Sequence, residues 1–537
     1  MKKIEKMKSR IALLVMFLMM FVSGYAANND LKVGMECGYA PFNWFQNNDK
    51  NGAVKIENGY CNGYDVEIAK LIAKGLNKKL VIVKSEWDAL LGPALSAGKV
   101  DIVIAGMSPT PERKQSLSFT KPYYESDLVV VVRKNSKYAN AKSINDFKGA
   151  KITGQQSTLH YNVIDQMKGV AKQEAMENFP SMVVALSSGK IDGYVSERPG
   201  AMAAVDSNPE LKFVSFEGEN GFTYEKSELD IAIGVKKGDE ELVGKIDKIL
   251  EEITPEQRKG IMDSAIKNQP KTDEVGENTD GEKTFFAWVA FFVKNNWKGF
   301  LTGTWNTLFI SLTGTIVGFI IGLGVTLVKN IHTDERTPKL KKIILKIANT
   351  IFSVYVAVFR GTPMIVQSMV IYYGLADILK FSPMGAALFI VSINTGAYMC
   401  EIIRGGIDSI DKGQFEAAEA LGMTHFQMMS SIIFPQMFRV ILPSIGNEFI
   451  INIKDTSVLN VISVTELFYT SNAIAGTYLR YYEVFIITSV IYFFLTFTLT
   501  AILKYIEKKI DGPQNFEFLE EVAEENSQNV EISGGNA

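Results

Sequence analysis

The feature that most constrains the fold of this chain is a series of long apolar segments in its second half. Five such segments can be recognised, near residues 300–328, 344–376, 383–404, 433–453 and 481–505. Each is long enough to cross the hydrocarbon core of a bilayer, which takes about 20 residues of helix. Backbone polar groups inside a bilayer must be satisfied within the segment, so we expect these crossings to be helical. Gly361-Thr362-Pro363 interrupts the second segment, and we predict that its helix breaks there.

The first apolar segment carries glycines at four-residue spacing. Gly314, Gly318 and Gly322 would share one face of a helix. Small residues let a second membrane helix approach closely, so this face is a candidate packing surface. The ordinary use of glycine in membrane helices is the alternative interpretation.

Basic residues in a connecting loop predict how these helices are oriented. The segment 329–346 carries six of them, Lys329, Arg336, Lys339, Lys341, Lys342 and Lys346. Loops rich in Lys and Arg stay in the cytoplasm. Counting helices from this loop places residues 405–432 and the acidic tail 509–537 in the cytoplasm as well. The part of the chain that precedes the helices is then expected outside the plasma membrane.

The first 26 residues have the pattern of a secretory signal peptide. They combine a basic start, an apolar core and small residues near Ala26. An uncleaved signal anchor is the alternative, and both deliver the following domain outside the membrane. Cys37 and Cys61 would then lie where disulfides persist, but their spacing alone does not show that they meet.

Residues 30–268 alternate β-rich runs with helical patterns. "LKVGMEC", "VDIVIAGM" and "LVVVVRK" read as strands, and "GYDVEIAKLIAKGLNKK" reads as an amphipathic helix. This alternation predicts an α/β domain with a mainly parallel sheet, long enough for two lobes. The polar, acidic segment 269–284 predicts a linker. The chain thus divides into a signal peptide 1–26, an α/β domain 30–268, a linker 269–284, a membrane domain 285–508 and a tail 509–537.

Composition and motifs exclude several classes of function. The formal net charge of −3 gives no general attraction to nucleic acid. The histidines, His160, His332 and His425, lie far apart without ligand spacing, so no metal site is predicted. The sequence has no GxxxxGK[ST] loop to hold a nucleotide's phosphates, so we expect no ATP hydrolysis by this chain. We also expect that it binds no cofactor and is not an enzyme.

The stretch "AGMSPTPERKQSLSF", residues 105–119, has the pattern of an anion site. Thr110 can cap a helix that has Pro111 at its first position, and Arg113 falls in the first turn. Together with the hydroxyl of Ser108, these groups could converge on one carboxylate. A well-capped helix with a surface arginine is the alternative on spacing alone.

Residues 30–268 resemble the bacterial substrate-binding proteins for polar amino acids. The matching stretches are "GMECGYAPFNW", "NGYDVEIAKLIA", "WDALLGPALSAGKVDIVIAGMSPTPERKQSLSFTKPYY", "GQQST" and "SGKIDGYVSERPGA". The resemblance implies the type II periplasmic-binding-protein fold, in which two α/β lobes close over one amino acid.

The resemblance also implies roles for individual residues. Arg113 would clamp the α-carboxylate of the ligand, and Glu197 would bind its α-ammonium at a position where aspartate is usual. Tyr39 and Trp87 would sandwich the ligand side chain. The further groups expected around the α-carboxylate belong to Gly106, Ser108, Thr110 and Thr158.

Two acidic residues predict which amino acid is bound. Glu36 and Asp65 fall where relatives that bind lysine, arginine or ornithine place carboxylates for the distal cation. Acids beside aromatic faces suit a long cationic side chain. We therefore favour a basic amino acid, with glutamine or another polar amino acid as the alternative. A solvated acid at Glu36 and a helix cap at Asp65 are the alternative structural roles.

The polar segment 411–432 predicts a helix, a tight turn and a second helix. Asp411 can start the first helix, Gly422 can end it, and Thr424 with Gln427 forms a capping box for the second. "EAAEALGMTHFQMMSSIIFP" is similar to the EAA loop of ABC importer permeases, which docks on the ATPase. By this resemblance the docking residues are Glu416, Ala417, Ala418 and Gly422.

The matching segments together predict the receptor and permease of an ATP-driven amino acid importer in one chain. The ATPase, which uses ATP and Mg, is expected to be a separate polypeptide. A homodimer of permease domains is the simplest assembly, and a heterodimer with another permease is the alternative. The alternatives are a ligand-gated channel or a sensor built on the same receptor fold. A channel would need a selectivity filter, and the sequence has none resembling TVGYG.

Overall fold

The computed structural model describes residues 29–511, apart from 58, 157, 177–178, 217, 226–228, 271–283, 332, 334–336 and 479. The predicted signal peptide, most of the predicted linker and most of the predicted tail therefore lie outside the described residues. The chain forms two compact units. The first unit combines Met1–Gly314, Gly361–Val391 and Lys454–Tyr492, and the second combines Thr315–Arg360, Ser392–Ile453 and Phe493–Ala537.

The first lobe of the α/β domain is built on a five-stranded sheet. Its order is β6 (Lys79–Lys84), β1 (Asp30–Met35), β7 (Ile102–Val103), β14 (Asp230–Lys236) and β8 (Leu117–Glu125). Strand β1 pairs in parallel with β6 and β7, and β14 runs antiparallel to β7 and β8. Leu31, Val33 and Met35 of β1 are fully buried in the lobe's core, which also contains the apolar face of α2 (Tyr64–Gly75).

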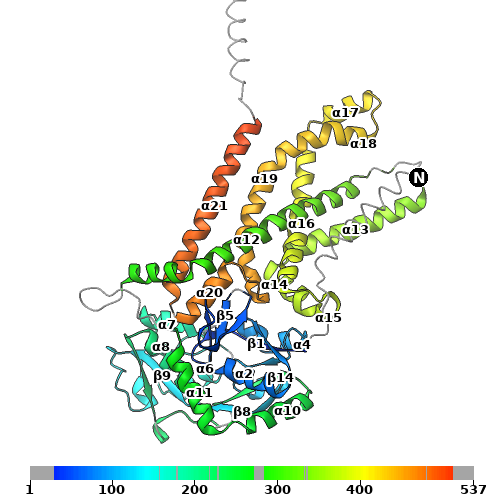
Figure 1. Cartoon of the computed structure of the whole chain (residues 1–537). Coiled ribbons are helices and arrows are strands. Elements are labelled where there is room, and N and C mark those ends of the chain that lie inside the picture. The colour runs from blue at the N-terminus through cyan, green and yellow to red at the C-terminus, as the bar shows by residue number, and fades with distance from the viewer. Residues whose placement is uncertain are drawn as a thin grey trace, which may run out of the picture. The chain divides into compact units, whose positions relative to one another are not determined.

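The second lobe has its own five-stranded sheet. Its order is β11 (Ala171–Lys172), β10 (Lys151–Thr153), β12 (Gly193–Glu197), β9 (Leu128–Arg133) and β13 (Leu211–Ser215). The central strand β9 is a continuous run of buried valines, typical of a strand covered on both faces. The chain crosses from β8 to β9 and returns at β14 (Figure 1).

The two lobes confirm the predicted α/β fold, but the sheets are mixed rather than mainly parallel. Strand β9 pairs antiparallel with both β12 and β13, and β14 pairs antiparallel with both β7 and β8. These strands follow the crossings between lobes, so they enter their sheets against the direction of their neighbours. Periodicity within one segment carries no information about that direction.

A small antiparallel sheet completes the first lobe, in the order β2 (Gly38–Tyr39), β3 (Asn43–Gln46), β5 (Gly59–Asn62) and β4 (Val54–Ile56). Cys37 and Cys61 form a disulfide beneath it, with their Cα atoms 5.8 Å apart and both side chains fully buried. The structure thus resolves the pairing that the spacing of the cysteines left open.

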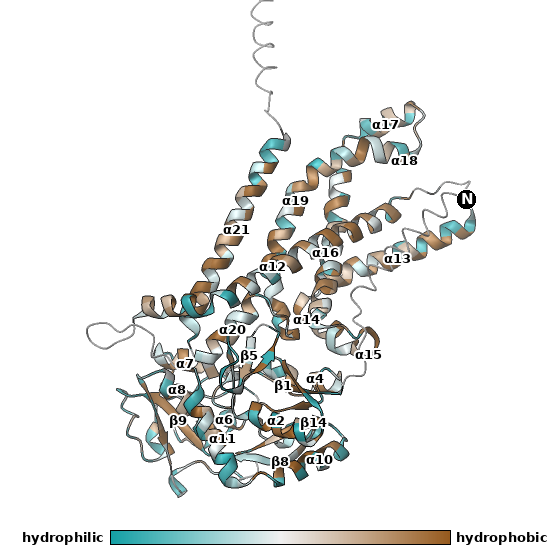
Figure 2. Cartoon of the chain, in the orientation of Figure 1, coloured by the Kyte–Doolittle hydropathy of each residue, from teal (hydrophilic) through white to brown (hydrophobic). Residues whose placement is uncertain are grey.

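Among the described residues, five helical segments are long and apolar enough to span a membrane, which confirms the predicted number. They contain α12 (Phe285–Lys329), α13 (Lys339–Gly361), α16 (Pro383–Asp408), α19 (Phe434–Asp455) and α21 (Tyr481–Asp511). Apolar residues follow these helices along most of their length (Figure 2). Helix α13 ends at Gly361 as predicted, and Pro363 caps the next helix, α14 (Met364–Met369).

The glycines of α12 pack against α16. A Cβ atom added to Gly318 would lie 2.8 Å from the Cβ of Thr395, and one added to Gly322 would lie 2.6 Å from that of Met399. Real side chains do not approach so closely, so only glycine permits this contact. The predicted packing face is confirmed at these positions.

Candidate functional site

A pocket between the two lobes collects most of the residues predicted to bind a ligand. Its wall includes Glu36, Tyr39, Trp87, Gly106, Ser108, Arg113, Thr158 and Glu197. Six further residues line it and were not predicted, namely Ala105, Gln155, Leu159, His160, Phe179 and Leu229. His160 follows Thr158 by two positions, and this proximity to a predicted ligand residue was the available signal.

Arg113 is the cation of this pocket and is almost fully buried, with 7% of its surface exposed. It lies on α5 (Pro111–Ser116), where Thr110 caps the helix by accepting a hydrogen bond from the Arg113 N–H at 3.4 Å. Its Nη1 donates to the carbonyl of Ser108 at 2.8 Å, and the guanidinium lies 5.0 Å from the centre of the Trp87 ring. Burial lowers the pKa of Arg113 to about 10, so it remains charged at neutral pH.

Thr110 itself is absent from the pocket wall. Its hydroxyl is engaged in capping α5, so it supports Arg113 instead of facing the pocket. The capped-helix interpretation of this stretch was therefore correct for Thr110, while Arg113 points into the pocket and is not a surface residue.

Glu197 is the buried anion of the pocket and comes from the opposite lobe. It is the last residue of β12 and is 2% exposed. Tyr39 of the first lobe donates its hydroxyl to Oε2 at 3.1 Å, and Nε2 of His160 lies 3.4 Å from Oε1. The carboxylate thus bridges the two lobes in this structure.

The aromatic wall of the pocket differs from a simple pair of rings. Tyr39 stacks on Phe42 with ring centres 5.3 Å apart and on Phe179 with centres 4.9 Å apart. Phe179 belongs to α7 (Phe179–Ser187) of the second lobe, so this stacking also joins the lobes. Burial and the nearby Glu197 raise the pKa of Tyr39 well above its ordinary value, which keeps its hydroxyl a hydrogen-bond donor.

Asp65 lies behind the pocket rather than on its wall. It is fully buried and accepts hydrogen bonds from the Tyr123 hydroxyl at 2.7 Å and from Nδ2 of Asn43 at 2.8 Å. Tyr123 in turn accepts from the N–H of Gly106 at 3.3 Å. Burial raises the pKa of Asp65 to about 7. Asp65 thus positions Gly106, and the expectation that it faces a distal cation is corrected.

The segment after α16 has the predicted helix-turn-helix form. Asp411 caps α17 (Lys412–Ala420) by accepting from the N–H of Gly413 at 2.7 Å, and Gly422 has a left-handed φ of +71°. Thr424 and Gln427 form a reciprocal capping box at the start of α18 (His425–Met428). These local predictions are confirmed.

The same segment exposes some of its predicted docking residues and buries another. Glu416 and Ala417 are exposed, and Leu421 and Phe426 are each 79% exposed although both are apolar. Ala418 is fully buried in a core cluster of the second unit, because it lies on the inward face of α17. Ala418 is therefore unavailable to a partner, and this part of the prediction is corrected.

Comparisons with known proteins match both halves of the chain. Residues 31–264 match the family of bacterial extracellular solute-binding proteins, family 3. Residues 344–512 match the inner membrane component of binding-protein-dependent transport systems. The arginine transport system permease protein ArtQ of Bacillus subtilis is 39% identical over 213 residues, which are 39% of this chain and 91% of that protein.

This chain belongs to the amino acid ABC transporter permeases. The permease is joined in one polypeptide to a solute-binding domain, and it is a transport subunit without catalytic function. The glutamine transport system permease protein GlnP of Escherichia coli is 36% identical over 213 residues, covering 39% of this chain and 92% of that protein. The L-cystine transport system permease protein TcyB of Bacillus subtilis is 36% identical over 206 residues, covering 38% and 85%.

Solved structures similar to the binding domain include an ancestral arginine-binding protein bound to arginine. It is 33% identical, with a TM-score of 0.37 over 44% of this chain and 98% of that chain. A substrate-binding protein from Streptococcus pneumoniae bound to L-arginine is 26% identical, with a TM-score of 0.39 over 44% and 94%.

Proposed function

We propose that this chain captures a basic amino acid outside the plasma membrane and passes it to its own membrane domain for ATP-driven import. The observation that carries the proposal is the meeting of Arg113 and Glu197 in one buried pocket. Their charges are opposite, they come from different lobes, and each is less than a tenth exposed. An amino acid zwitterion carries the complementary carboxylate and ammonium.

In this proposal Arg113 binds the α-carboxylate and Glu197 binds the α-ammonium. Buried charges are stable only when they are paired and hydrogen-bonded. In the structure Tyr39 and His160 contact the carboxylate of Glu197. A bound α-ammonium would take up a position beside the same carboxylate, so ligand binding and contact between the lobes are linked through Glu197.

Charge balance around Glu36 supports a cationic side chain. Glu36 and Glu86 line a chamber that adjoins the pocket, and Lys84 is the cation beside them. Two carboxylates and one ammonium leave one negative charge in a largely buried space. A lysine or arginine side chain would neutralise it, whereas glutamate would add to it.

Glutamine is the second candidate because the chamber also offers unsatisfied donors. In the described part of the chain, Nζ of Lys84 and Nε1 of Trp87 are buried without a hydrogen-bond acceptor. A carboxamide oxygen would accept from them, and arginine has no acceptor to offer. Permeases named for arginine and for glutamine are both among the relatives.

Calorimetry of the binding domain against lysine, arginine, histidine, glutamine and glutamate separates these candidates. We expect the tightest binding for a basic amino acid. Binding of glutamine alone would reject the assignment of Glu36 to a substrate cation, and binding of none of them would reject both candidate substrates.

The orientation and the partner are also part of the proposal. The Cys37–Cys61 disulfide supports an oxidising, extracellular location for the binding domain, because such bonds are rare in the cytosol. The basic loop before α13 and the exposed α17–α18 segment would then face the cytoplasm, where a separate ATPase that uses ATP and Mg docks. Two copies of this chain would supply the two permease domains of one importer. Uptake of labelled amino acid by vesicles tests this: transport without the ATPase or without ATP would contradict it.

A further inference from the structure

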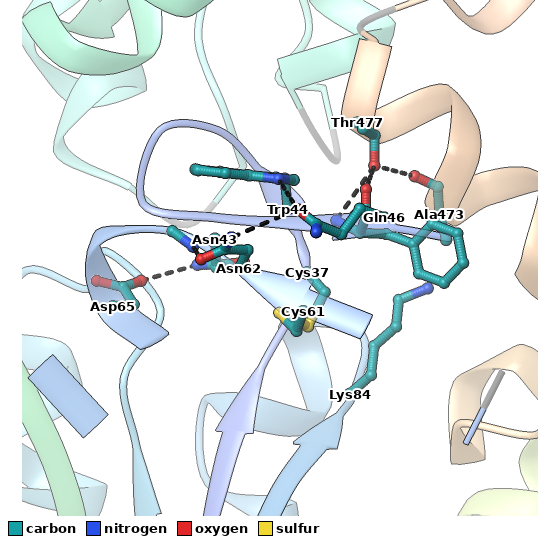
Figure 3. The surroundings of a disulfide bond; sticks show 12 residues. Cys37, Asn43, Trp44, Gln46, Cys61, Asn62, Asp65, Lys84, Ala473 and Thr477 are labelled. Atoms are coloured by element: carbon teal, nitrogen blue, oxygen red, sulfur yellow. Dashed lines mark hydrogen bonds between the residues drawn. A yellow bond between two sulfur atoms is a disulfide. The ribbon is translucent and has the colours of Figure 1, made fainter. Parts of the chain in front are cut away.

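Helix α20 (Leu467–Tyr478) of the membrane domain belongs to the same compact unit as the binding domain and lies against its small sheet. The hydroxyl of Thr477 lies 3.2 Å from the N–H nitrogen and 3.1 Å from the carbonyl oxygen of Phe45 in β3. A Cβ atom added to Gly476 would lie 3.2 Å from the Cα of Gly38, so the two backbones are nearly in contact. Figure 3 shows Ala473 and Thr477 of α20 beside Gln46 of β3.

The start of α20 is fixed by Glu466, the residue just before it. Glu466 is fully buried and accepts hydrogen bonds from the N–H groups of Phe468 at 2.9 Å and Tyr469 at 2.6 Å. Tyr492 of α21 also donates to this carboxylate, at 3.0 Å. The helix is therefore held in place from the membrane side as well as by the binding domain.

A chamber between α20 and the binding domain continues the ligand pocket. Glu36, Tyr39, Trp87, Gln155 and Phe179 line both spaces. Asn472, Ala473 and Gly476 of α20 line only the chamber. Arg113 and Glu197 line only the pocket, so the chamber begins beyond the groups that would hold the α-carboxylate and α-ammonium.

The chamber is polar, and α20 takes part in that polarity. Nζ of Lys84 lies 3.7 Å from the centre of the Tyr469 ring, and the Tyr469 hydroxyl donates to the carbonyl of Lys84 at 3.1 Å. Figure 3 shows Lys84 extending from β6 toward α20. Nδ2 of Asn472 lies 3.5 Å from Oε1 of Glu86, and Oδ1 of Asn472 accepts a hydrogen bond from the hydroxyl of Tyr481. Burial lowers the pKa of Lys84 to about 8, although the negative charges of Glu86 and Glu36 act to raise it.

We propose that α20 forms the far wall of the substrate's side-chain site, so that a helix of the permease takes part in selecting the amino acid. The class of ligand is an α-amino acid with a long polar side chain. Its α-groups would stay in the pocket and its distal polar group would reach Glu36 and Asn472. This inference rests on the proposed function, because it requires an amino acid in the pocket.

The test measures binding of labelled amino acids to the purified full-length chain in lipid nanodiscs. The ligands are pairs matched in chemistry that differ in length: lysine with 2,3-diaminopropionate, and glutamine with asparagine. Ala473→Leu is designed to fill part of the chamber, because Ala473 lines its wall. We expect about tenfold or greater loss of affinity for the longer member of a pair and little change for the shorter one, as for a pocket shortened by a few methylenes.

Thr477→Val is the matched control on the same helix. Valine keeps the volume of threonine but removes the hydroxyl that contacts Phe45. Because Thr477 is not part of the chamber wall, we expect this variant to change the affinities for long and short ligands by the same factor. Asn472→Asp is a second variant that adds a carboxylate without adding volume. It should raise the affinity for arginine relative to glutamine by about tenfold, the usual effect of a charge-assisted pair.

Three outcomes are decisive. A shorter-ligand preference in Ala473→Leu together with a higher arginine-to-glutamine ratio in Asn472→Asp supports the inference. If Asn472→Asp has the same arginine-to-glutamine affinity ratio as the wild type, the role of α20 in selection is overturned. This result decides the question even if Ala473→Leu is too unstable to purify. If the wild-type chain binds no amino acid at all, the proposed function fails and not merely the role of α20.

Discussion

The buried carboxyl of Asp65 makes the stability of the binding domain depend on pH in an unusual direction. Its pKa is about 7 in the folded protein, against about 3.9 for an aspartate in an unfolded chain. Between these values the folded state holds a proton that the unfolded state has lost. The free energy of unfolding therefore falls as pH rises from about 4 to about 7.

The size of this effect follows from the shift. About three units at 1.36 kcal/mol each give about 4 kcal/mol over the whole window, or about 1.4 kcal/mol per pH unit within it. Asp65→Asn should remove the dependence, because an amide does not titrate. The Oδ1 atom of the introduced asparagine can still accept the hydrogen bond from Tyr123. Its Nδ2 group needs an acceptor, and the buried Oδ1 of Asn43, which has no donor in the described structure, can supply one if the Asn43 amide flips.

Urea denaturation of the binding domain at half-unit steps from pH 4.5 to pH 8 measures this directly. As pH rises across that range, we expect the unfolding free energy of the wild type to fall relative to that of Asp65→Asn. Glu67→Gln is the control on the same helix, because Glu67 is partly exposed and paired with Lys70. Parallel pH profiles for the wild type and Asp65→Asn would refute the assignment of a raised pKa to Asp65.

Three further predictions concern other parts of the molecule. Arg113→Gln should weaken amino acid binding by about a hundredfold or more, because the ligand's buried α-carboxylate would lose its cationic partner. Calorimetry checks this, with Lys114→Gln, a substitution at an exposed neighbour, as the control. Cys37→Ser should lower the unfolding free energy of the domain by about 3.5 kcal/mol for a loop of 24 residues, measured by denaturation without reductant. Phe426→Asp should abolish copurification of the ATPase without changing amino acid affinity, because Phe426 is exposed on α18; retained copurification would argue against docking there.

Much of the fold was predictable because its signals are local. The caps at Thr110, Asp411 and Thr424 depend on hydrogen bonds within three residues, and each was found where the sequence indicated it. The end of α13 before Pro363 depends on one missing N–H. The number of membrane helices depends only on the length of apolar runs.

Predictions about single side chains were less complete, because burial and partners are decided by distant parts of the chain. Asp65 stands at the start of a helix, and its sequence neighbours do not show that Tyr123 covers it. Ala418 lies among exposed residues, yet the helix presents it to a core that forms from α16 and α19. Both were assigned to binding surfaces on sequence alone, and both are buried.

The sequence alone therefore determined the membrane helices, the helix caps and the α/β character of the first domain, since each follows from residues a few positions apart or from whole-segment composition. The two-lobed receptor and the permease were expected from the resemblance of longer stretches to known families. Only the tertiary structure brought Tyr39 to Glu197 across 158 residues and Tyr469 to Lys84 across 385. The physical reason is that a hydrogen bond or a ring contact requires atoms within a few ångströms. Sequence patterns show which chemical groups a chain carries, whereas its tertiary fold decides which of these groups come into contact.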